Sequence, residues 1–331
     1  MIISRTPFRI SLFGGGTDYP KWYNKYTGGV INATINKYCY ITTRFLPPFF
    51  KYKHRIRYYL HEETNSLENI KHPSVRETAK FLNIDKGIEV VHNADLPARS
   101  GLGSSSSFTV GLLNAFYGMK NYLPTKRELA LNAIHIEQNM IKENVGSQDQ
   151  TAAAFGGLNR VHFSKDNIID VDSILISPSR LKKLQNNLML FFTGFARNAS
   201  DIAEEQIKLT MKKKEELKKI YEICSEGFSV LNDKNRSIDE IGYLLNKQWL
   251  IKRTLTNKIT NDNIDEIYKI GIKAGAIGGK LLGAGAGGFI LFYVPKGNQD
   301  NVKKALNKRL FVPFRFETTG SKIIYHSHQD Y

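Results

Sequence analysis

Apolar and polar residues alternate in several segments of the first third of the chain, with the period of a β-strand. The pattern covers residues 1–13, 30–45 and 88–93. Pro7 interrupts the first segment, so we expect a bend or an edge position there. The second segment is rich in β-branched and aromatic residues and predicts one or two strands. Residues 47–73 are basic and aromatic, and we expect strands with an exposed loop.

Helical spacing follows the third predicted strand. Residues 108–117 favour one helix, and residues 125–142 favour a second, longer one. Thr125 and Glu128 at the start of the second helix fit a capping box, in which each side chain bonds the backbone N–H of the other.

The second half of the chain mixes predicted strands and helices. Strands are expected at residues 188–193, 289–294 and 312–317. Helices are expected as a long charged segment from about Asp201, capped by Ser200, and at residues 238–255, 263–274 and 298–309. A polar, turn-rich stretch at 166–180 suggests a domain boundary, so the predicted domains are residues 1–175 and 176–331. Strands with packed helices and no internal repeat predict the α+β class.

The composition bounds the possible partners. The 331 residues suffice for two domains, and the net charge of +16 suits nucleic acid, an anionic membrane surface or phosphorylated small molecules. The basic residues are scattered, as at Lys212–Lys214 beside Glu215, which is typical of a solvated helix face. Cys39 and Cys224 show no metal or redox spacing, which indicates a reducing compartment. The most apolar stretch, residues 289–294, is too short to span a bilayer, so we expect a cytoplasmic protein.

A glycine- and serine-rich segment, residues 97–108, lies between a predicted strand and a predicted helix; we call it the phosphate cradle. Gly101 and Gly103 let a ligand approach the backbone closely. The amides that follow point out of a helix N-terminus, which favours negative charge, and four serines add hydroxyls. No Lys-Ser or Lys-Thr closes the segment, so it differs from the common nucleotide loop. The alternative is a flexible linker.

Three acidic residues are candidates for chemistry. Asp18 ends the triple-glycine turn, residues 14–18, where its carboxylate could accept bonds from sugar hydroxyls or simply cap a helix. Asp149 is expected in the first turn of a short helix capped by Ser147. There the helix dipole keeps a carboxylate ionised, able to accept or orient a hydroxyl proton, unless it only stabilises the helix. Glu137 lies within a predicted helix, where an exposed glutamate is the usual outcome.

A second glycine-rich segment, residues 283–288, which we call the glycine loop, matches the dinucleotide-binding pattern by letter. We reject that match, because the pattern needs a strand before it and a helix after it, and the order here is reversed. We expect its glycines to let this loop pack close to the phosphate cradle and support it.

Three ordered motifs resemble those of the GHMP small-molecule kinases: residues 6–18, 97–107 and 280–288. The resemblance implies two α+β domains, the first like domain 2 of ribosomal protein S5 and the second ferredoxin-like. It also implies ATP and Mg²⁺ as cofactors, bound between the domains. The implied roles are as follows: catalysis by Asp149 and Arg9; ATP binding by Arg99, Ser100, Gly101, Leu102, Gly103, Ser104, Ser105 and Ser106; Mg²⁺ ligation by Ser105 and Glu137; and sugar binding by Gly15, Gly16, Thr17 and Asp18.

The same resemblance narrows the choice of the sugar that accepts the phosphoryl group. Galactokinases carry Gly-Glu-His-Thr-Asp where this chain has Gly-Gly-Gly-Thr-Asp at residues 14–18, which disfavours galactose. Residues 5–20 and 192–200 are similar to D-glycero-D-manno-heptose 7-phosphate kinases, which phosphorylate the anomeric hydroxyl to give the 1,7-bisphosphate for nucleotide-activated heptose synthesis. Arg197 is the candidate substrate contact, although a helix-capping loop arginine is the alternative. A fucokinase-like sugar 1-kinase is the second candidate.

Other classes of function fit the sequence less well. A nucleic-acid-binding protein needs a clustered basic stripe with interleaved aromatic residues, and residues 51–59 are the best local candidate. That function leaves Ser105, Glu137 and Asp149 without roles. A degraded kinase acting as a sensor conflicts with the intact set of these three residues. We therefore expect a small-molecule sugar phosphate as partner, no nucleic acid and no membrane, and a monomer or homodimer.

Overall fold

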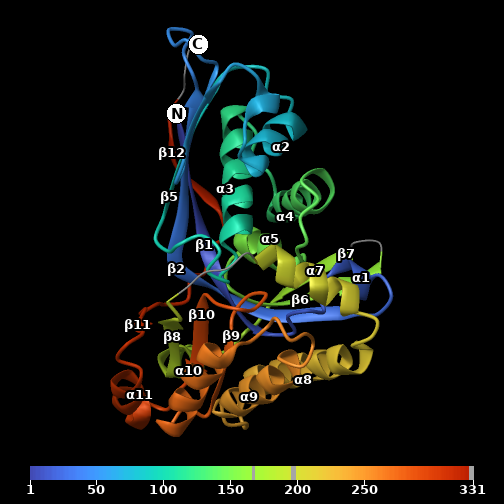
Figure 1. The fold of residues 1–331 in the computed structure, drawn as a ribbon, viewed down its shortest axis with the longest axis vertical. Coiled ribbons are helices and arrows are strands. Elements are labelled where there is room, and N and C mark those ends of the chain that lie inside the picture. The colour runs from blue at the N-terminus through green and yellow to red at the C-terminus, as the bar shows by residue number, and fades with distance from the viewer. Residues whose placement is uncertain (166–167, 195–198, 328–331) are drawn as a thin grey trace.

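The computed structural model describes residues 1–165, 168–194 and 199–327. Its strands build two separate sheets, one large and one small (Figure 1). The strands are β1 (Ile2–Phe13), β2 (Gly28–Phe45), β3 (His54–Arg57), β4 (His61–Thr64), β5 (Ile88–Ala94), β6 (Leu158–Ser164), β7 (Ile168–Ser173), β8 (Leu188–Phe192), β9 (Gly278–Leu281), β10 (Phe289–Tyr293), β11 (Leu310–Phe311) and β12 (Lys322–His326).

Helices connect these strands. They are α1 (Pro20–Tyr23), α2 (Pro73–Phe81), α3 (Ser104–Met119), α4 (Lys126–His135), α5 (Gln148–Phe155), α6 (Pro178–Asn187), α7 (Ala199–Leu209), α8 (Lys214–Asn232), α9 (Glu240–Lys252), α10 (Asp262–Lys273) and α11 (Gln299–Ala305), with 3-10 helices η1 (Leu67–Asn69) and η4 (Lys296–Asn298) and a π-helix, η2 (Ile136–Met140). Within the described part of the chain, no helix is long and apolar enough to cross a membrane.

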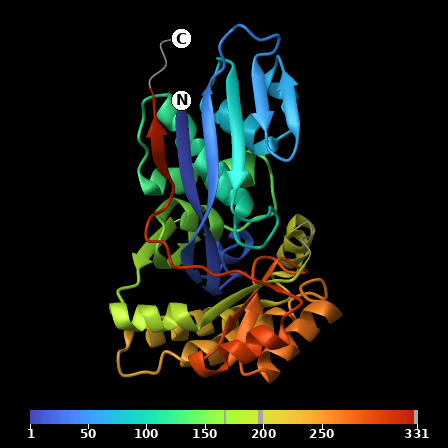
Figure 2. The same cartoon turned by 90° about the vertical axis from the view of Figure 1, so that its left-hand side faces the viewer.

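The large sheet has the strand order β12-β1-β2-β5-β3-β4, and β6 and β7 extend it from the other half of the long strand β2. Figure 2 shows its strands side by side with the helices behind them. Helix α3 packs along β1 and β2, and α5 packs beside it. The register of β1 against β2 shifts between Pro7 and Phe8, which confirms the expected irregularity at this proline.

The small sheet is antiparallel, with the order β11-β8-β10-β9. Helix α9 packs on β9 and also contacts β1, and α8 contacts both β1 and β2. Helices from the second half of the chain therefore lie against the large sheet as well as against their own. The mixture of strands and helices confirms the α+β class, while the predicted boundary between residues 175 and 176 stays a prediction.

Several predicted elements differ from the structure. The long charged helix is two helices, because the chain turns at residues 210–213 and the Thr210 hydroxyl bonds the Gln206 carbonyl at 3.0 Å. The side chain of Ser200, its predicted cap, lies outside the described residues. Residues 312–317 are not the last strand, because they cross from one sheet to the other: the Val312 amide donates to the Leu190 carbonyl of the small sheet, and the Glu317 amide donates to the Thr34 carbonyl of the large one. The last strand is β12, which the sequence pattern did not reveal.

The capping box at the start of α4 is confirmed: the Thr125 hydroxyl accepts from the Glu128 amide, and the Glu128 carboxylate accepts from the Thr125 amide. The helix that follows does not run unchanged to residue 142. It becomes a π-helix at residue 136, and this change of pitch rotates the following side chains relative to a regular helix.

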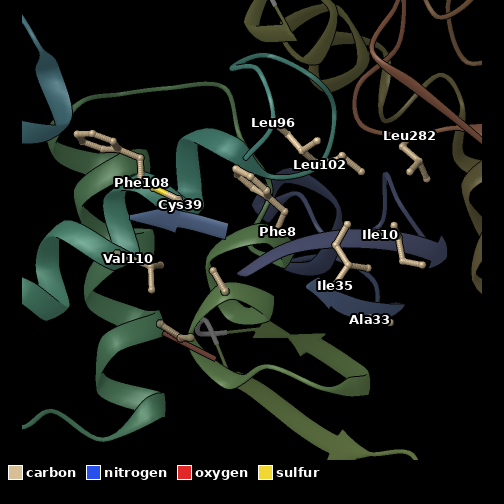
Figure 3. Close-up of a cluster of buried hydrophobic side chains, with 14 of the residues drawn as sticks. Phe8, Ile10, Ala33, Ile35, Cys39, Leu96, Leu102, Phe108, Val110 and Leu282 are labelled. Carbon is tan, nitrogen blue, oxygen red and sulfur yellow. The ribbon is translucent and has the colours of Figure 1, made fainter. Parts of the chain in front are cut away.

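Buried apolar side chains join the large sheet to α3 and to both glycine-rich segments. Phe8 and Ile10 of β1 belong to one cluster with Leu102 of the cradle and Leu282, just before the glycine loop. Figure 3 shows part of this cluster. Leu102 and Leu282 are fully buried, so each segment is anchored in the core by one leucine while its polar backbone stays near the surface.

The chain end crosses α5 on its way to β12. The Ser321 amide bonds the Ala153 carbonyl at 2.8 Å, and a Cβ at Gly320 would overlap the carbonyl oxygen of Ala154. The C-terminal segment therefore packs directly against α5, the helix that carries Asp149.

Gly320→Ala is expected to lower the free energy of unfolding by about 2 kcal/mol, because the added methyl group meets backbone that cannot rotate away. The denaturant midpoint measures this change. Gly297→Ala is the control, since no heavy atom lies within 4 Å of a methyl group at that position. Equal midpoints for the two variants would contradict the described crossing.

Candidate active site

The phosphate cradle follows β5, as the sequence predicted, and it includes the first turn of α3, which begins at Ser104 rather than at the predicted residue 108. Gly103 precedes the helix in the left-handed conformation, with φ of 76°, and the Ser107 amide donates to its carbonyl at 2.8 Å. The amides of Ser104, Ser105 and Ser106 therefore precede the helical ladder and point out of the helix N-terminus. This is the geometry that binds phosphate groups.

The start of the cradle is held by its own side chains and backbone. Arg99 has a positive φ of 59°, and its amide donates to the Ser104 hydroxyl at 3.1 Å. Ser100 is buried, and its hydroxyl has no partner among the described residues. Arg99 itself is exposed, so its guanidinium is available to a ligand at the mouth of the cradle.

Arg9 and Asp149 form a two-pronged ion pair beside the cradle. The Arg9 Nε donates to Asp149 Oδ1 and Nη2 donates to Oδ2, both at 2.8 Å. The third guanidinium nitrogen, Nη1, donates to the Gly101 carbonyl at 2.7 Å, and the Arg9 backbone amide donates to the Leu102 carbonyl. Arg9 is 4% exposed, whereas the Asp149 side chain is 25% exposed. The pair therefore fixes the carboxylate and leaves part of it open to a ligand.

Asp149 lies in the first turn of α5, as expected, but the predicted cap is different. The Ser147 side chain makes no capping bond. Its hydroxyl pairs with the Tyr23 hydroxyl at 3.0 Å and accepts from the Gln138 amide at 3.1 Å. Ser147 thus connects α5 to α1 and η2, while the Asp149 carboxylate is oriented by Arg9 rather than by the helix start.

Asp18 is buried at the end of the triple-glycine turn. Its Oδ1 accepts from the Gly16 amide at 2.9 Å, and its side chain packs directly against Gly146, three residues before Asp149. Burial raises the pKa of Asp18, and the nearby Asp149 charge adds to that rise. The structure therefore brings Asp18, Arg9 and Asp149 into one charged group.

The rest of the triple-glycine turn is buried as well. Gly15 and Gly16 carry no side chain, and the Thr17 hydroxyl is used within the fold. It donates to the Gly14 carbonyl at 2.8 Å and accepts from the Gly29 amide at 3.0 Å. Sugar binding by Gly15, Gly16 and Thr17 stays a prediction, and their observed task is to shape the turn that presents Asp18.

Glu137 is buried, not exposed as a helical glutamate usually is, with 1% of its surface accessible. Its Oε2 accepts from the Ser106 hydroxyl at 2.7 Å and from the Gln150 amide, while its Oε1 has no partner among the described residues. Burial raises the pKa of Glu137 to about 7, against the lowering effect of its Ser106 bond. An unpartnered buried carboxylate oxygen is a fitting ligand for a hard cation.

Ser106 is the serine that contacts Glu137, while Ser105 is the predicted Mg²⁺ ligand. Ser105 lies on the exposed side of the first turn of α3, and its carbonyl accepts from the Thr109 hydroxyl at 3.2 Å. Within the described ranges, no three His, Cys, Asp or Glu side chains gather as a ready metal site. Mg²⁺ ligation by Ser105 and Glu137 therefore stays a prediction.

The glycine loop packs against the cradle, as expected. A Cβ on Gly101 would lie 2.5 Å from the Leu282 carbonyl oxygen, and a Cβ on Gly283 would lie 2.5 Å from the Gly101 Cα. Such distances exclude any side chain at either position, so backbone meets backbone. The two segments, far apart in the sequence, form one surface.

Two buried lysines near this surface were not found from the sequence as site residues. Lys252 ends α9 and donates to the Gly283 carbonyl at 2.6 Å, and Lys280 on β9 donates to the Leu12 carbonyl at 3.2 Å. The signal for Lys252 was its spacing, because it continues the buried stripe of α9 formed by Ile241, Leu245 and Gln248. Arg197, the predicted substrate contact, lies outside the described residues.

Comparison with known proteins decides the family. The sequence pattern of the GHMP kinases N terminal domain matches residues 70–157, and that of the GHMP kinases C terminal domain matches residues 228–311. The D-glycero-alpha-D-manno-heptose 7-phosphate kinase of Campylobacter jejuni is 31% identical over 329 residues, covering 93% of each chain. This chain belongs to the GHMP kinases.

Two further relatives agree with the family. The crystal structure of a D-glycero-D-manno-heptose 1-phosphate kinase from Bacteroides thetaiotaomicron has a TM-score of 0.81, covering 99% of this chain and 100% of that one at 24% identity. The galactokinase of Pyrococcus furiosus is 24% identical, covering 96% of this chain and 95% of its own. The expected GHMP kinase fold and ATP-dependent sugar kinase class are confirmed.

Glu137 is expected to contribute less to the stability of the metal-free GHMP kinase as pH rises from about 4.5 to 7, because burial raises its pKa and the folded state therefore favours the protonated carboxyl. Glu137→Gln removes this loss. In EDTA the variant should be more stable than the native protein at pH 8, by about 2 kcal/mol, and close to it at pH 5.

Denaturant midpoints at the two pH values measure the effect. Glu215→Gln on the exposed face of α8 is the control and should show no such difference between pH 5 and pH 8. A Glu137→Gln variant that is destabilised equally at both pH values would contradict the buried, readily protonated carboxyl.

Proposed function

We propose that this GHMP kinase transfers the γ-phosphoryl group of ATP to the anomeric hydroxyl of D-glycero-D-manno-heptose 7-phosphate, giving the 1,7-bisphosphate for nucleotide-activated heptose synthesis. The observation that carries the proposal is the Arg9–Asp149 pair beside the open N-terminus of α3. The 31% identity to a heptose 7-phosphate kinase over 93% of the chain supports the choice of acceptor.

The cradle binds the triphosphate of ATP. The amides of Ser104, Ser105 and Ser106 face the phosphate oxygens, and the helix dipole favours their negative charge. Exposed Arg99 at the mouth adds a charged donor. These contacts position the γ-phosphoryl group at the N-terminus of α3. Arg9 and Asp149 lie beside it, because Arg9 bonds both the Asp149 carboxylate and the Gly101 carbonyl of the cradle.

Asp149 orients the acceptor. Its partly exposed carboxylate accepts a hydrogen bond from the anomeric hydroxyl and receives its proton as the oxygen attacks the γ-phosphorus and the bond to ADP breaks. Arg9 keeps the carboxylate in place and lies where negative charge develops on the transferred group. Asp18, held beside Gly146, accepts bonds from further sugar hydroxyls.

Glu137 and the cradle serines would hold Mg²⁺. The ion, when bound, supplies charge neutralisation between the phosphate oxygens. In its absence, the buried Glu137 carboxyl retains its bonds to Ser106 and Gln150, which keep its second oxygen directed away from other protein groups. Ser105, which is exposed in the first turn of α3, is the second proposed ligand of the ion.

A cavity of about 520 Å³ beside the triple-glycine turn supports an acceptor with further polar groups. Its wall includes Tyr19, directly after Asp18, together with Lys21, Asn24, Gln138 and Asn144. Lys21 and the amides are the donors that this wall offers to hydroxyl and phosphate oxygens, and the rest of the lining includes Glu143 and the apolar side chains of Leu131, Ile134, Ile169 and Ile207. A fucokinase-like acceptor is the second candidate, since the fucokinase/GDP-fucose pyrophosphorylase of Arabidopsis thaliana matches 92% of this chain at 22% identity.

Asp149→Ala should reduce kcat by at least about a thousandfold while leaving the affinity for an ATP analogue within threefold, since the cradle does not use this carboxylate. Asp149→Asn should show the same loss and retain a bond to Arg9, which separates catalysis from the cost of an unpaired buried guanidinium. Asp170→Asn, on the exposed face of β7, is the control. Normal turnover by either Asp149 variant would refute the role.

The acceptor is tested by ADP release with heptose 7-phosphate, the free heptose, mannose, fucose and galactose. We expect heptose 7-phosphate to have the highest kcat/KM, by at least tenfold, because the 7-phosphate group adds binding energy through its contacts with the cavity. Comparable values for fucose or mannose would overturn the proposed acceptor and leave the sugar kinase class intact.

A further inference from the structure

Lys252 is a buried cation that has no role in the phosphoryl transfer proposed above. It is 5% exposed at the end of α9, and its Nζ donates to the Gly283 carbonyl at 2.6 Å. Burying an ammonium group is costly unless charge or hydrogen bonds compensate. A methionine would fill the same space at lower cost, so the charge at this position needs an explanation.

The carbonyl that Lys252 holds belongs to the residue that touches the cradle. Gly283 packs on Gly101, and the Gly101 carbonyl accepts from Arg9 Nη1 at 2.7 Å. Lys252 and Arg9 thus hold two glycines in direct contact, one from each side. Through Arg9 the same chain of contacts reaches the Asp149 carboxylate.

Helix α9 fixes the surrounding loops with two side chains on one face. Gln248, one turn before Lys252, donates to the Leu12 carbonyl and accepts from the Gly14 amide at 2.8 Å. Gln248 therefore holds the triple-glycine turn, while Lys252 holds the glycine loop. Residues four apart on a helix lie side by side, so one helix sets the distance between the two segments.

The charged groups around Lys252 come from four different elements. Asp18 follows β1, Arg9 lies on β1, Asp149 lies on α5, and Lys280 lies on β9. Burial lowers the pKa of Lys252 to about 8, while Asp18 and Asp149 act in the opposite direction and Arg9 adds to the lowering. Burial lowers the pKa of Lys280 well below its usual value, so Arg9 and Lys252 are the cations that this group offers to a polyphosphate.

We propose that Lys252 is a positioning residue for phosphoryl transfer, which holds the glycine loop on the cradle and places a second buried positive charge, after that of Arg9, beside the transferred group. The proposal rests on the proposed phosphoryl-transfer site. It adds a charged residue from the second half of the chain to the Arg9–Asp149 pair from the first half, and it explains why α9 ends in a buried lysine.

The test compares Lys252→Met, which keeps the volume and removes the charge, with Lys252→Arg, which keeps the charge. Lys120→Met is the control, because Lys120 also donates its Nζ to a backbone carbonyl, that of Leu82, at 2.8 Å and far from the cradle. Steady-state kinetics are measured from pH 6 to pH 10, with whichever sugar or sugar phosphate the native enzyme accepts best.

Lys252→Met should lower kcat by about a hundredfold at pH 7 and change KM for ATP by less than threefold, since the amides and Arg99 still bind the nucleotide. Native kcat should fall as pH rises through about 8, when the ammonium loses its proton. Lys252→Arg should move this fall to higher pH, because an arginine keeps its proton throughout.

A decrease below tenfold for Lys252→Met, or a fall with pH that Lys252→Arg leaves in place, would overturn the proposal. If Lys252→Met does not fold, the pH profile of Lys252→Arg decides alone, since a merely structural contact would not move it. A native enzyme that rejects heptose 7-phosphate and accepts another sugar overturns only the proposed acceptor, and the same comparison then runs on that sugar.

Discussion

The direct contact of Gly101 with Gly283 is the constraint on which the site depends. Neither position has room for a methyl group, so the two backbones meet without any side chain between them. Leu102 and Leu282, each next to one of these glycines, are buried in the same apolar cluster and keep the segments from separating. The carbonyl groups at this contact then accept the charged donors of Arg9 and Lys252, so packing and electrostatics act at the same point.

The site buries more charge than a stable fold requires. Arg9, Asp18, Lys252 and Lys280 are nearly inaccessible, and each is paired with a backbone group or an opposite charge. Such groups keep fixed positions, because moving them would leave a charge unpaired in a poorly solvating interior. Fixed charges need no reorganisation when a substrate becomes more negative during reaction, which is how preorganised sites lower a barrier. Burial shifts Glu137, Asp18 and Lys280 towards their neutral forms, so Arg9 carries the firmest charge of this group.

Local sequence signals predicted much of this arrangement. The capping box of Thr125 and Glu128, the glycines on either side of Leu102, and the place of Asp149 in a first helical turn all follow from neighbours within a few residues. The close packing of the glycine loop on the cradle was also predicted, because a run of small residues before a buried strand has few other uses.

Features set by distant contacts could not be predicted in the same way. Glu137 lies seven residues after Ala130 and four after Ala133, so its spacing indicates the buried face while its charge indicates the surface. Ser106 rather than Ser105 meets it, since adjacent residues on a helix differ by about 100° in direction and the choice depends on how α3 packs. The spacing of Lys252 on α9 indicates a core position, whereas its charge indicates the surface. Its burial is explained only by the contact with the glycine loop, which lies far away in the sequence.

The pairing of β12 with β1 joins segments from opposite ends of the chain, and the Met1 amino group donates to the Ser327 carbonyl at 2.7 Å across 326 positions of sequence. During synthesis the outer edge of β1 therefore stays unpaired until residues 322–326 have left the ribosome. An open edge is a template for pairing with other chains. Arg9 lies on this same strand, so the nascent protein carries its key guanidinium on an element that gains its last neighbour only after residues 322–326 have been made.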